Sequence, residues 1–117
     1  MQVMKMNFKN HKEVQDMISL VVKEQGVTAS EAIDSSINQQ MYQRLLETGW
    51  GSIALPLWGH DDPERQWIEL DKPSLEVELS YEKIKLINDV KMKEEVDMET
   101  AIGYFLLFRM EMMGYHI

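Results

Sequence analysis

The sequence contains no cysteine among its 117 residues. This absence excludes a disulfide framework, cysteine-ligated zinc and a thiol nucleophile, and it fits a reducing compartment, so we expect a cytoplasmic location. The first residues alternate apolar and polar side chains without a long apolar run, so we expect no secretory signal. With 44% hydrophobic and 27% charged residues, the chain has the composition of one ordinary globular domain over residues 1–117.

Catalytic and cofactor motifs are also lacking. No serine lies in a Gly-x-Ser-x-Gly elbow, and no glycine-rich phosphate loop occurs. The densest polar group is residues 59–64, which contain His60, Asp61 and Asp62. Their spacing matches no calcium or zinc pattern, and Asp-Asp-Pro is typical of turns. We therefore expect no enzyme activity, no cofactor and no metal site, and His60 and Asp61 are the first residues to mutate if this expectation fails.

Positive charge is scarce, because 12 lysines and arginines face 20 aspartates and glutamates, for a net charge of −8. The imbalance is concentrated in residues 24–82, which carry three basic and twelve acidic side chains, whereas residues 1–23 are net positive and residues 83–117 nearly neutral. Nucleic acids and anionic lipids are repelled by such a segment, and a basic protein surface is attracted. The simpler interpretation is that the charge only keeps the protein in solution.

No apolar run is long enough for a membrane span. The most apolar stretch, Glu99–Met113, is shorter than the roughly 20 residues that a span needs, and Arg109 and Glu111 interrupt it. A helix that is apolar on nearly every side is buried in its own domain or in a partner. We assign four of its side chains to the chain's own core: Ile102, Phe105, Leu106 and Met110. The other large ones, Tyr104, Leu107 and Phe108, are left for the sheet or for a second copy of the chain, which predicts a homodimer.

Helical patterns fill the first part of the chain, up to residue 48. Asn10 precedes Glu13 at capping-box spacing, and apolar residues follow at helical intervals until Gly26, a typical left-handed C-cap. Thr28 to Glu31 form a second capping box, which opens a helix. Two adjacent serines, Ser35 and Ser36, weaken the middle of this helix and are a point at which it could split. These patterns predict a helical hairpin over residues 11–48.

Residues 50–79 differ in character, since they contain all three tryptophans and all three prolines. Short strand-like runs occur at residues 52–58, 66–70 and 75–79, and the last alternates apolar residues with Glu76 and Glu78. We predict a small antiparallel meander here, and a short leading strand over residues 3–8.

Helical patterns return at residues 81–93 and 98–113 and predict a second hairpin over residues 81–113. The expected fold class is α+β, with two helical hairpins flanking the small antiparallel meander. The alternative is an all-α fold in which the middle strands are only extended loops.

A weak internal repeat links the two predicted hairpins. A shift of 69 residues superimposes their apolar positions, for example Ile18 on Ile87 and Ala32 on Ala101, and it places Thr28 on Asp97, two good N-cap residues. Two unrelated amphipathic hairpins in the same phase explain this agreement about equally well.

One segment resembles the helix-turn-helix of bacterial DNA-binding regulators. Residues 21–33 carry an apolar helix end, a Gly-Val-Thr turn and a second helix with alanine at a packing position. The resemblance implies that Thr28, Ala29 and Ser30 face base edges. The flanks supply the acidic residues Glu24, Glu31 and Asp34, and the next basic residue along the chain is Arg44. This charge pattern does not favour phosphate contacts, so nucleic-acid binding is not the preferred prediction.

The preferred prediction is a small acidic factor that binds proteins, such as a regulator, adaptor or inhibitor, without catalytic activity. Its partner is expected to present a basic surface. The predicted partner-binding residues are Trp50, Trp58, Trp67, Glu76 and Glu78, and the competing interpretation is that the indoles belong to the core. Two alternatives stay open: a helix-turn-helix DNA-binding regulator, and a binder of small apolar molecules through the C-terminal helix.

Overall fold

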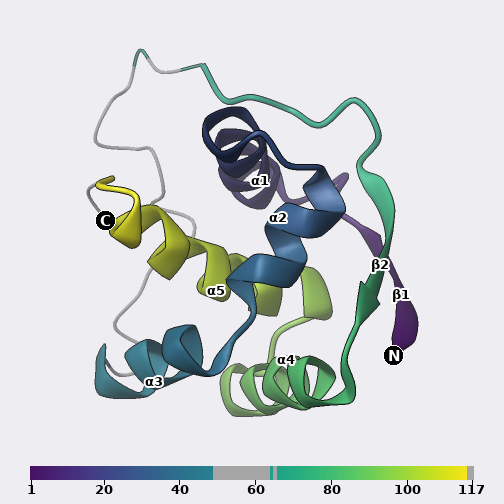
Figure 1. Cartoon of the computed structure of the whole chain (residues 1–117), viewed down its shortest axis with the longest axis vertical. Coiled ribbons are helices and arrows are strands. Elements are labelled where there is room, and N and C mark those ends of the chain that lie inside the picture. Colours follow the sequence, from purple (N-terminus) through teal and green to yellow (C-terminus); the bar gives the residue numbers. More distant parts are fainter. Residues whose placement is uncertain (49–63, 65, 116–117) are drawn as a thin grey trace.

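The computed structural model describes residues 1–48, 64 and 66–115. Over these residues it has two strands and five helices (Figure 1): β1 (Gln2–Asn7), α1 (Lys12–Gln25), α2 (Ala29–Ser36), α3 (Gln39–Thr48), β2 (Ser74–Leu79), α4 (Tyr81–Glu94) and α5 (Met98–Met112). The predicted α+β class is confirmed, and the all-α alternative is wrong. No helix within the described ranges is long and apolar enough to cross a membrane.

β1 and β2 form a two-stranded antiparallel sheet, here called the ribbon, in which Lys5 lies opposite Glu76. The leading strand and the strand at residues 75–79 were both predicted, but the meander is wrong, because the two strands that pair are far apart in the sequence. The predicted strand at residues 52–58 lies outside the described residues.

The segment at residues 66–70 has no regular secondary structure and pairs with no described strand, which also contradicts the meander. Two buried polar residues of α1 explain why. The backbone N–H of Ile68 donates to Asp16 Oδ1 at 3.0 Å, and that of Leu70 donates to Gln15 Oε1 at 2.9 Å. Gln15 Nε2 in turn donates to the carbonyl of Phe8 at 2.7 Å. Side chains of α1 thus accept the backbone hydrogen bonds that the carbonyls of a neighbouring strand would otherwise accept.

The helices repeat with the 69-residue shift of the sequence. α1 and α4 each have 14 residues with ends that differ by this shift, and α2 and α5 begin at equivalent positions. We call β1, α1, α2 and α3 the first unit, and β2, α4 and α5 the second unit.

The caps follow the same shift. Thr28 Oγ1 accepts a hydrogen bond from the N–H of Glu31 at 3.1 Å, and Asp97 Oδ1 accepts one from Thr100 at 2.9 Å. Among the three predicted N-caps, those of α1, α2 and α5, only that of α1 differs from the prediction, because it is His11 and not Asn10.

The two units differ after their second helix begins. The helix predicted up to residue 48 is split at its two adjacent serines, since α2 ends at Ser36 and α3 begins at Gln39. Ser35 and Ser36 both donate their hydroxyls to the carbonyl of Ala32, at 3.3 and 2.7 Å, which competes with continuation of the helix. Asn38 Oδ1 then accepts from the N–H of Met41 at 2.9 Å and so starts α3.

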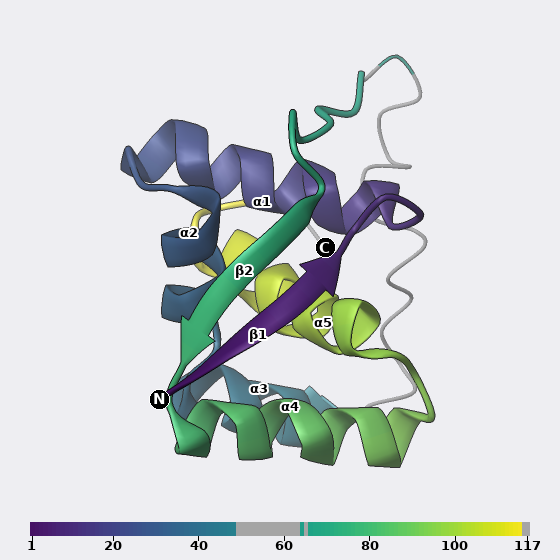
Figure 2. The same cartoon turned by 90° about the vertical axis from the view of Figure 1, so that its right-hand side faces the viewer.

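α5 is the centre of the molecule and packs against the other four helices and β1. Figure 2 shows the ribbon across one face, with α1 and α4 near its two ends and α5 behind it. Nine of the fifteen residues of α5 are buried, so the interpretation of this stretch as a buried helix is confirmed.

Polar contacts hold α3 against its neighbours. The Tyr42 hydroxyl donates to Asp89 of α4, and this hydrogen bond together with burial raises the pKa of the phenol. Lys93 Nζ lies 3.3 Å from Asp89 Oδ2 and 3.4 Å from the Tyr42 hydroxyl. On the other side, the guanidinium of Arg44 pairs with Glu111 of α5.

Candidate functional site

The outer face of the ribbon is the best-defined surface on which predicted partner-binding residues lie. Successive side chains of a strand point to opposite sides, and here one set is exposed while the other packs on the core. The outer face consists of Val3, Lys5, Asn7, Ser74, Glu76 and Glu78. Two of the predicted residues, Glu76 and Glu78, therefore project from one strand into solvent.

Both edges of the ribbon are contacted by helix starts, in a reciprocal way. Ser30 of α2 donates its hydroxyl to the carbonyl of Glu76 in β2 at 3.2 Å. Glu99 of α5 accepts from the N–H of Asn7 in β1 at 3.0 Å. Ser30 and Glu99 are equivalent under the 69-residue shift, and so are Asn7 and Glu76. The second helix of each unit is thus hydrogen-bonded to the strand of the other unit. These contacts leave the outer face of the ribbon open.

A shallow hollow of about 470 Å³ opens along this region. It is lined by Lys5, Met6, Asn7, Ser74, Leu75, Glu76 and Glu99. Three charged side chains meet there, two acidic and one basic, and Glu78 adds a further carboxylate on the same strand as Glu76. The charge of the outer face and its hollow is therefore negative, with Lys5 as the single base among these residues.

A second polar contact joins the starts of α1 and α5, beside the ribbon. His11 Nε2 and Asp97 Oδ2 are 3.0 Å apart. Burial raises the pKa of Asp97, but hydrogen bonds from Thr100 and from His11 outweigh it and leave the pKa below the usual value of an aspartate. The carboxylate at this helix start is therefore held in its charged form, as favours a helix N-terminus.

Trp67 does not belong to the outer face. Trp67 is half-buried in the segment that Gln15 and Asp16 hold against α1. Trp50 and Trp58 lie outside the described residues, as do His60 and Asp61, so their predicted roles stay predictions. No group of three or more metal-ligating side chains occurs among the residues that the structure describes.

The three residues predicted at a dimer interface are buried within the chain itself. Tyr104, Leu107 and Phe108 are 8%, 3% and 1% exposed. The sequence could not show that four helices of the same chain surround them. The homodimer stays a prediction, but these side chains do not offer a surface for it.

The hydroxyls proposed to read DNA bases already have partners inside the chain. Thr28 caps α2, and Ser30 bonds to β2. Ala32 and Ile33 of the same helix are fully buried against the core. A helix seated in this way presents little of its length to a DNA groove.

Sequence reasoning missed Lys5 and Val3 as members of the outer face. The alternation over residues 3–8 indicated that these two side chains share a side. The pairing that sets them opposite Glu76 and Glu78 depends on contacts across more than half of the chain.

Comparison with known proteins gives no match: no family model, no curated protein and no solved structure is significantly similar to this chain.

Proposed function

We propose that the protein is a non-catalytic binding factor that receives a basic segment of a partner protein on the outer face of its ribbon. The observation that carries this proposal is the pair of carboxylates, Glu76 and Glu78, exposed side by side on β2. They lie on a hydrogen-bonded strand pair and not on a loop, so binding to them requires little ordering of the protein.

The charge of the face favours a protein partner. Alternate residues of a strand lie about 7 Å apart, a spacing that lysines or arginines at alternate positions of an extended segment match. Exposed charge pairs contribute modestly, about 0.2–1 kcal/mol each, so affinity must come from several contacts in register. Val3, which is 59% exposed and lies opposite Glu78, supplies an apolar contact beside the carboxylates.

The test compares two charge reversals of equal size. The first is Glu76→Lys with Glu78→Lys on the outer face, and the control is Glu47→Lys with Glu69→Lys, two exposed acids elsewhere on the chain. Binding of a labelled ten-residue peptide of alternating lysine and serine is followed by fluorescence anisotropy at 50 and 150 mM salt. We expect the outer-face variant to lose about tenfold or more in affinity, and the control at most about twofold.

Equal losses in the two variants would assign binding to net charge alone and remove the basis of the proposal. Circular dichroism and urea unfolding of both variants verify that they are folded.

DNA binding is the second candidate, because a two-stranded antiparallel ribbon has a shape that enters the major groove. Its electrostatics oppose this use, since Glu76, Glu78 and Glu99 would face phosphates with Lys5 as the single base on the face. A gel shift at low salt decides between the candidates. A wild-type protein that leaves DNA unshifted there is not a DNA binder, whereas a shift abolished by Lys5→Glu would replace the protein-binding proposal.

A further inference from the structure

The backbone of β1 directs part of its hydrogen-bonding groups away from the ribbon. In an antiparallel pair, alternate residues of a strand direct their N–H and C=O to the partner strand, and the residues between them direct these groups outwards. The N–H of Phe8 donates across to the carbonyl of Pro73 at 2.9 Å, whereas that of Asn7 donates outwards to Glu99. Every second residue of β1 before Asn7 therefore also points its backbone groups outwards.

Helix starts meet the two outer edges of the ribbon at different positions (Figure 2). Ser30 of α2 bonds to the carbonyl of Glu76, the middle one of three outward-pointing residues of β2, so no two successive ones stay open there. The start of α5 meets β1 at its last residue, Asn7. The two outward-pointing residues before it, Val3 and Lys5, have no outer backbone partner among the described residues. We call this stretch the open edge of β1.

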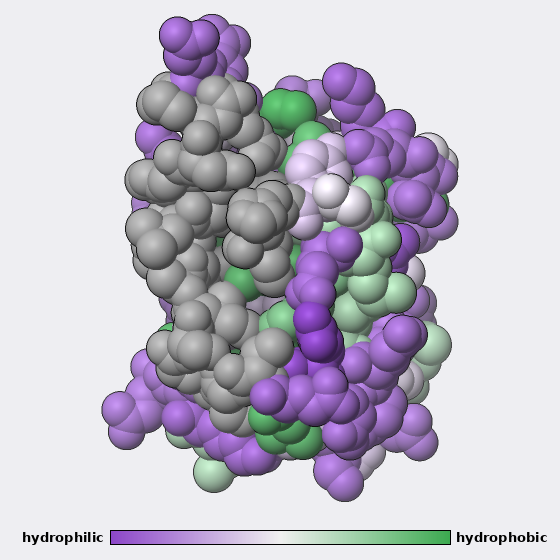
Figure 3. Space-filling model, turned by 90° about the vertical axis from the view of Figure 1, so that its left-hand side faces the viewer, coloured by the Kyte–Doolittle hydropathy of each residue, from purple (hydrophilic) through white to green (hydrophobic). Residues whose placement is uncertain are grey.

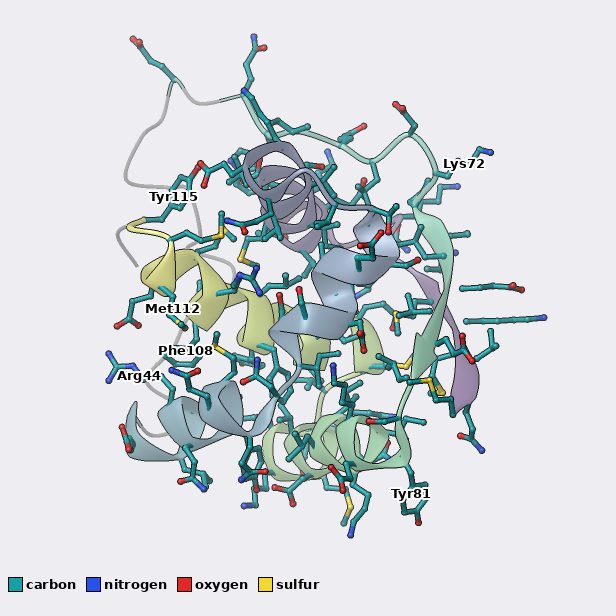
Figure 4. The ribbon with its side chains drawn as sticks, in the orientation of Figure 1. Arg44, Lys72, Tyr81, Phe108, Met112 and Tyr115 are labelled. Atoms are coloured by element: carbon teal, nitrogen blue, oxygen red, sulfur yellow. The ribbon has the colours of Figure 1, made fainter. Side chains whose placement is uncertain are left out.

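A groove of about 470 Å³ between α3 and α5 offers no comparable binding surface, because its aromatic residue is covered. The guanidinium of Arg44 pairs with Glu111 and lies 6.0 Å from the centroid of the Phe108 ring. Figure 4 shows Arg44 and Phe108 together between the two helices. Figure 3 shows only small hydrophobic patches on the mostly hydrophilic described surface of this side of the molecule.

We propose that the open edge of β1 binds the same edge of a second copy of the chain, in antiparallel orientation. The edge is self-complementary, since each copy offers the N–H and C=O of two residues and needs the same groups from its partner. Pairing joins the two ribbons into one four-stranded sheet with a two-fold axis. Because α2 interrupts the edge of β2, association stops at the dimer and does not continue into fibres.

Charge and strand length select the register of this pairing. With Lys5 of each copy opposite Val3 of the other, two hydrogen-bonded residue pairs form and the lysines are not directly opposed. Lys5 opposite Lys5 would place like charges against each other, which is destabilising. A register centred on Val3 would extend beyond the first residue of β1. The selected register brings the two half-buried Met4 side chains together at the two-fold axis, where Cα atoms approach to about 4.5 Å.

The dimer is compatible with the proposed protein-binding function and does not depend on it, since Glu76 and Glu78 stay exposed on the outer face. It also gives the expected homodimer a surface that does not involve α5. The interface is small, so we expect a dissociation constant on the order of 50 µM at 150 mM salt. Each copy carries a net charge of −8, so the dimer should tighten about threefold between 50 and 300 mM salt.

Sedimentation equilibrium of the full chain from 5 to 500 µM measures the dimer. The test variant is Lys5→Pro, which removes a backbone N–H that points away from β2 and so keeps the ribbon's own hydrogen bonds. Its matched control is Lys5→Gln, which removes the same charge but keeps the N–H. We expect Lys5→Pro to raise the dissociation constant about tenfold or more, and Lys5→Gln to change it at most about threefold.

Cysteine cross-linking tests the register, because the chain has no cysteine of its own. Met4→Cys should form a covalent dimer in a glutathione redox buffer, since the Cα separation at the two-fold axis lies within the range of disulfides. Leu75→Cys, likewise half-buried on the inner face but in β2, should stay monomeric. If circular dichroism shows that Lys5→Pro is unfolded, these two cysteine variants decide.

Three results would each overturn the proposal. They are a monomer mass up to 500 µM, a dimer that a folded Lys5→Pro variant leaves unchanged, and equal cross-linking of Met4→Cys and Leu75→Cys.

Discussion

The two units of this protein start alike and end differently. Both consist of a strand, a 14-residue helix, a turn through a left-handed residue and a second helix with a hydrogen-bonded N-cap. In the first unit the second helix stops after eight residues, whereas in the second unit it runs for fifteen. α5, the helix that continues, forms the centre of the core. The helix of the first unit is interrupted after Ser36, which gives α3 and the groove between α3 and α5.

The residues at equivalent positions explain this difference. Position 36 of the first unit corresponds to position 105 of the second, and these are serine and phenylalanine, both fully buried. The Ser36 hydroxyl donates to the carbonyl of Ala32 in its own helix, whereas Phe105 lies fully buried in α5, which packs against the other four helices. One unit therefore contributes local hydrogen bonds at this position and the other contributes apolar volume.

Truncation at these two positions gives the largest expected contrast. Phe105→Ala removes a fully buried ring and should lower the free energy of unfolding by about 3–5 kcal/mol. Ser36→Ala removes a hydroxyl whose single hydrogen bond lies within its own helix, so the change should stay within about 1 kcal/mol. Urea unfolding followed by circular dichroism measures both.

A loss at Ser36 as large as that at Phe105 would contradict the assignment of the core to α5. If Phe105→Ala does not fold, Phe105→Leu gives the same comparison with a smaller loss, because most of the apolar volume is kept.

The sequence predicted the local features of both units well. Capping residues, left-handed turn positions and apolar periodicity depend on neighbours within a few residues, so Thr28, Asp97 and Gly26 could be identified from the chain alone. The pairing of β1 with β2 could not be predicted in this way, since one alternating pattern is compatible with many partners.

The candidate sites depend on long-range contacts to different degrees. Glu76 and Glu78 were predicted from alternation, but Lys5 joined them only through the strand register. The open edge of β1 depends on where the starts of α2 and α5 meet the ribbon, which no local pattern shows. Residues 66–70 illustrate the opposite error: an alternating pattern predicted a strand, whereas the segment has no regular secondary structure and is hydrogen-bonded to Gln15 and Asp16 of α1.

The turns after α1 and α4 should respond in opposite directions to substitution. Gly26 and Glu95 both adopt positive φ, 65° and 53°, a region in which residues other than glycine are strained. Gly26→Ala should therefore destabilise the protein by about 1 kcal/mol. Since no atom beyond the adjacent residues lies within 4 Å of the added Cβ, the loss is a backbone effect. Glu95→Gly should stabilise it by up to about 1 kcal/mol. Urea midpoints that shift in the same direction would contradict the equivalence of the turns.

The two N-caps provide the smallest contrast, which depends on pH. Asp97 is ionised and Thr28 is neutral, and the pKa of Asp97 is lower in the folded protein than is usual for aspartate. A lowered folded-state pKa adds stability that is present above the usual pKa, near 4, and is lost as the pH falls through the folded-state value. Asp97→Asn keeps a capping oxygen without the charge, so it should cost about 0.3–1 kcal/mol at pH 7, towards the lower end because the side chain is half exposed. This difference should disappear by about pH 2–3, whereas the cost of Thr28→Ala should not follow this titration. Urea unfolding of the two variants and the wild type at pH 7, 5, 4 and 3 measures it, and a cost of Asp97→Asn that grows towards low pH would show that the charge does not stabilise α5.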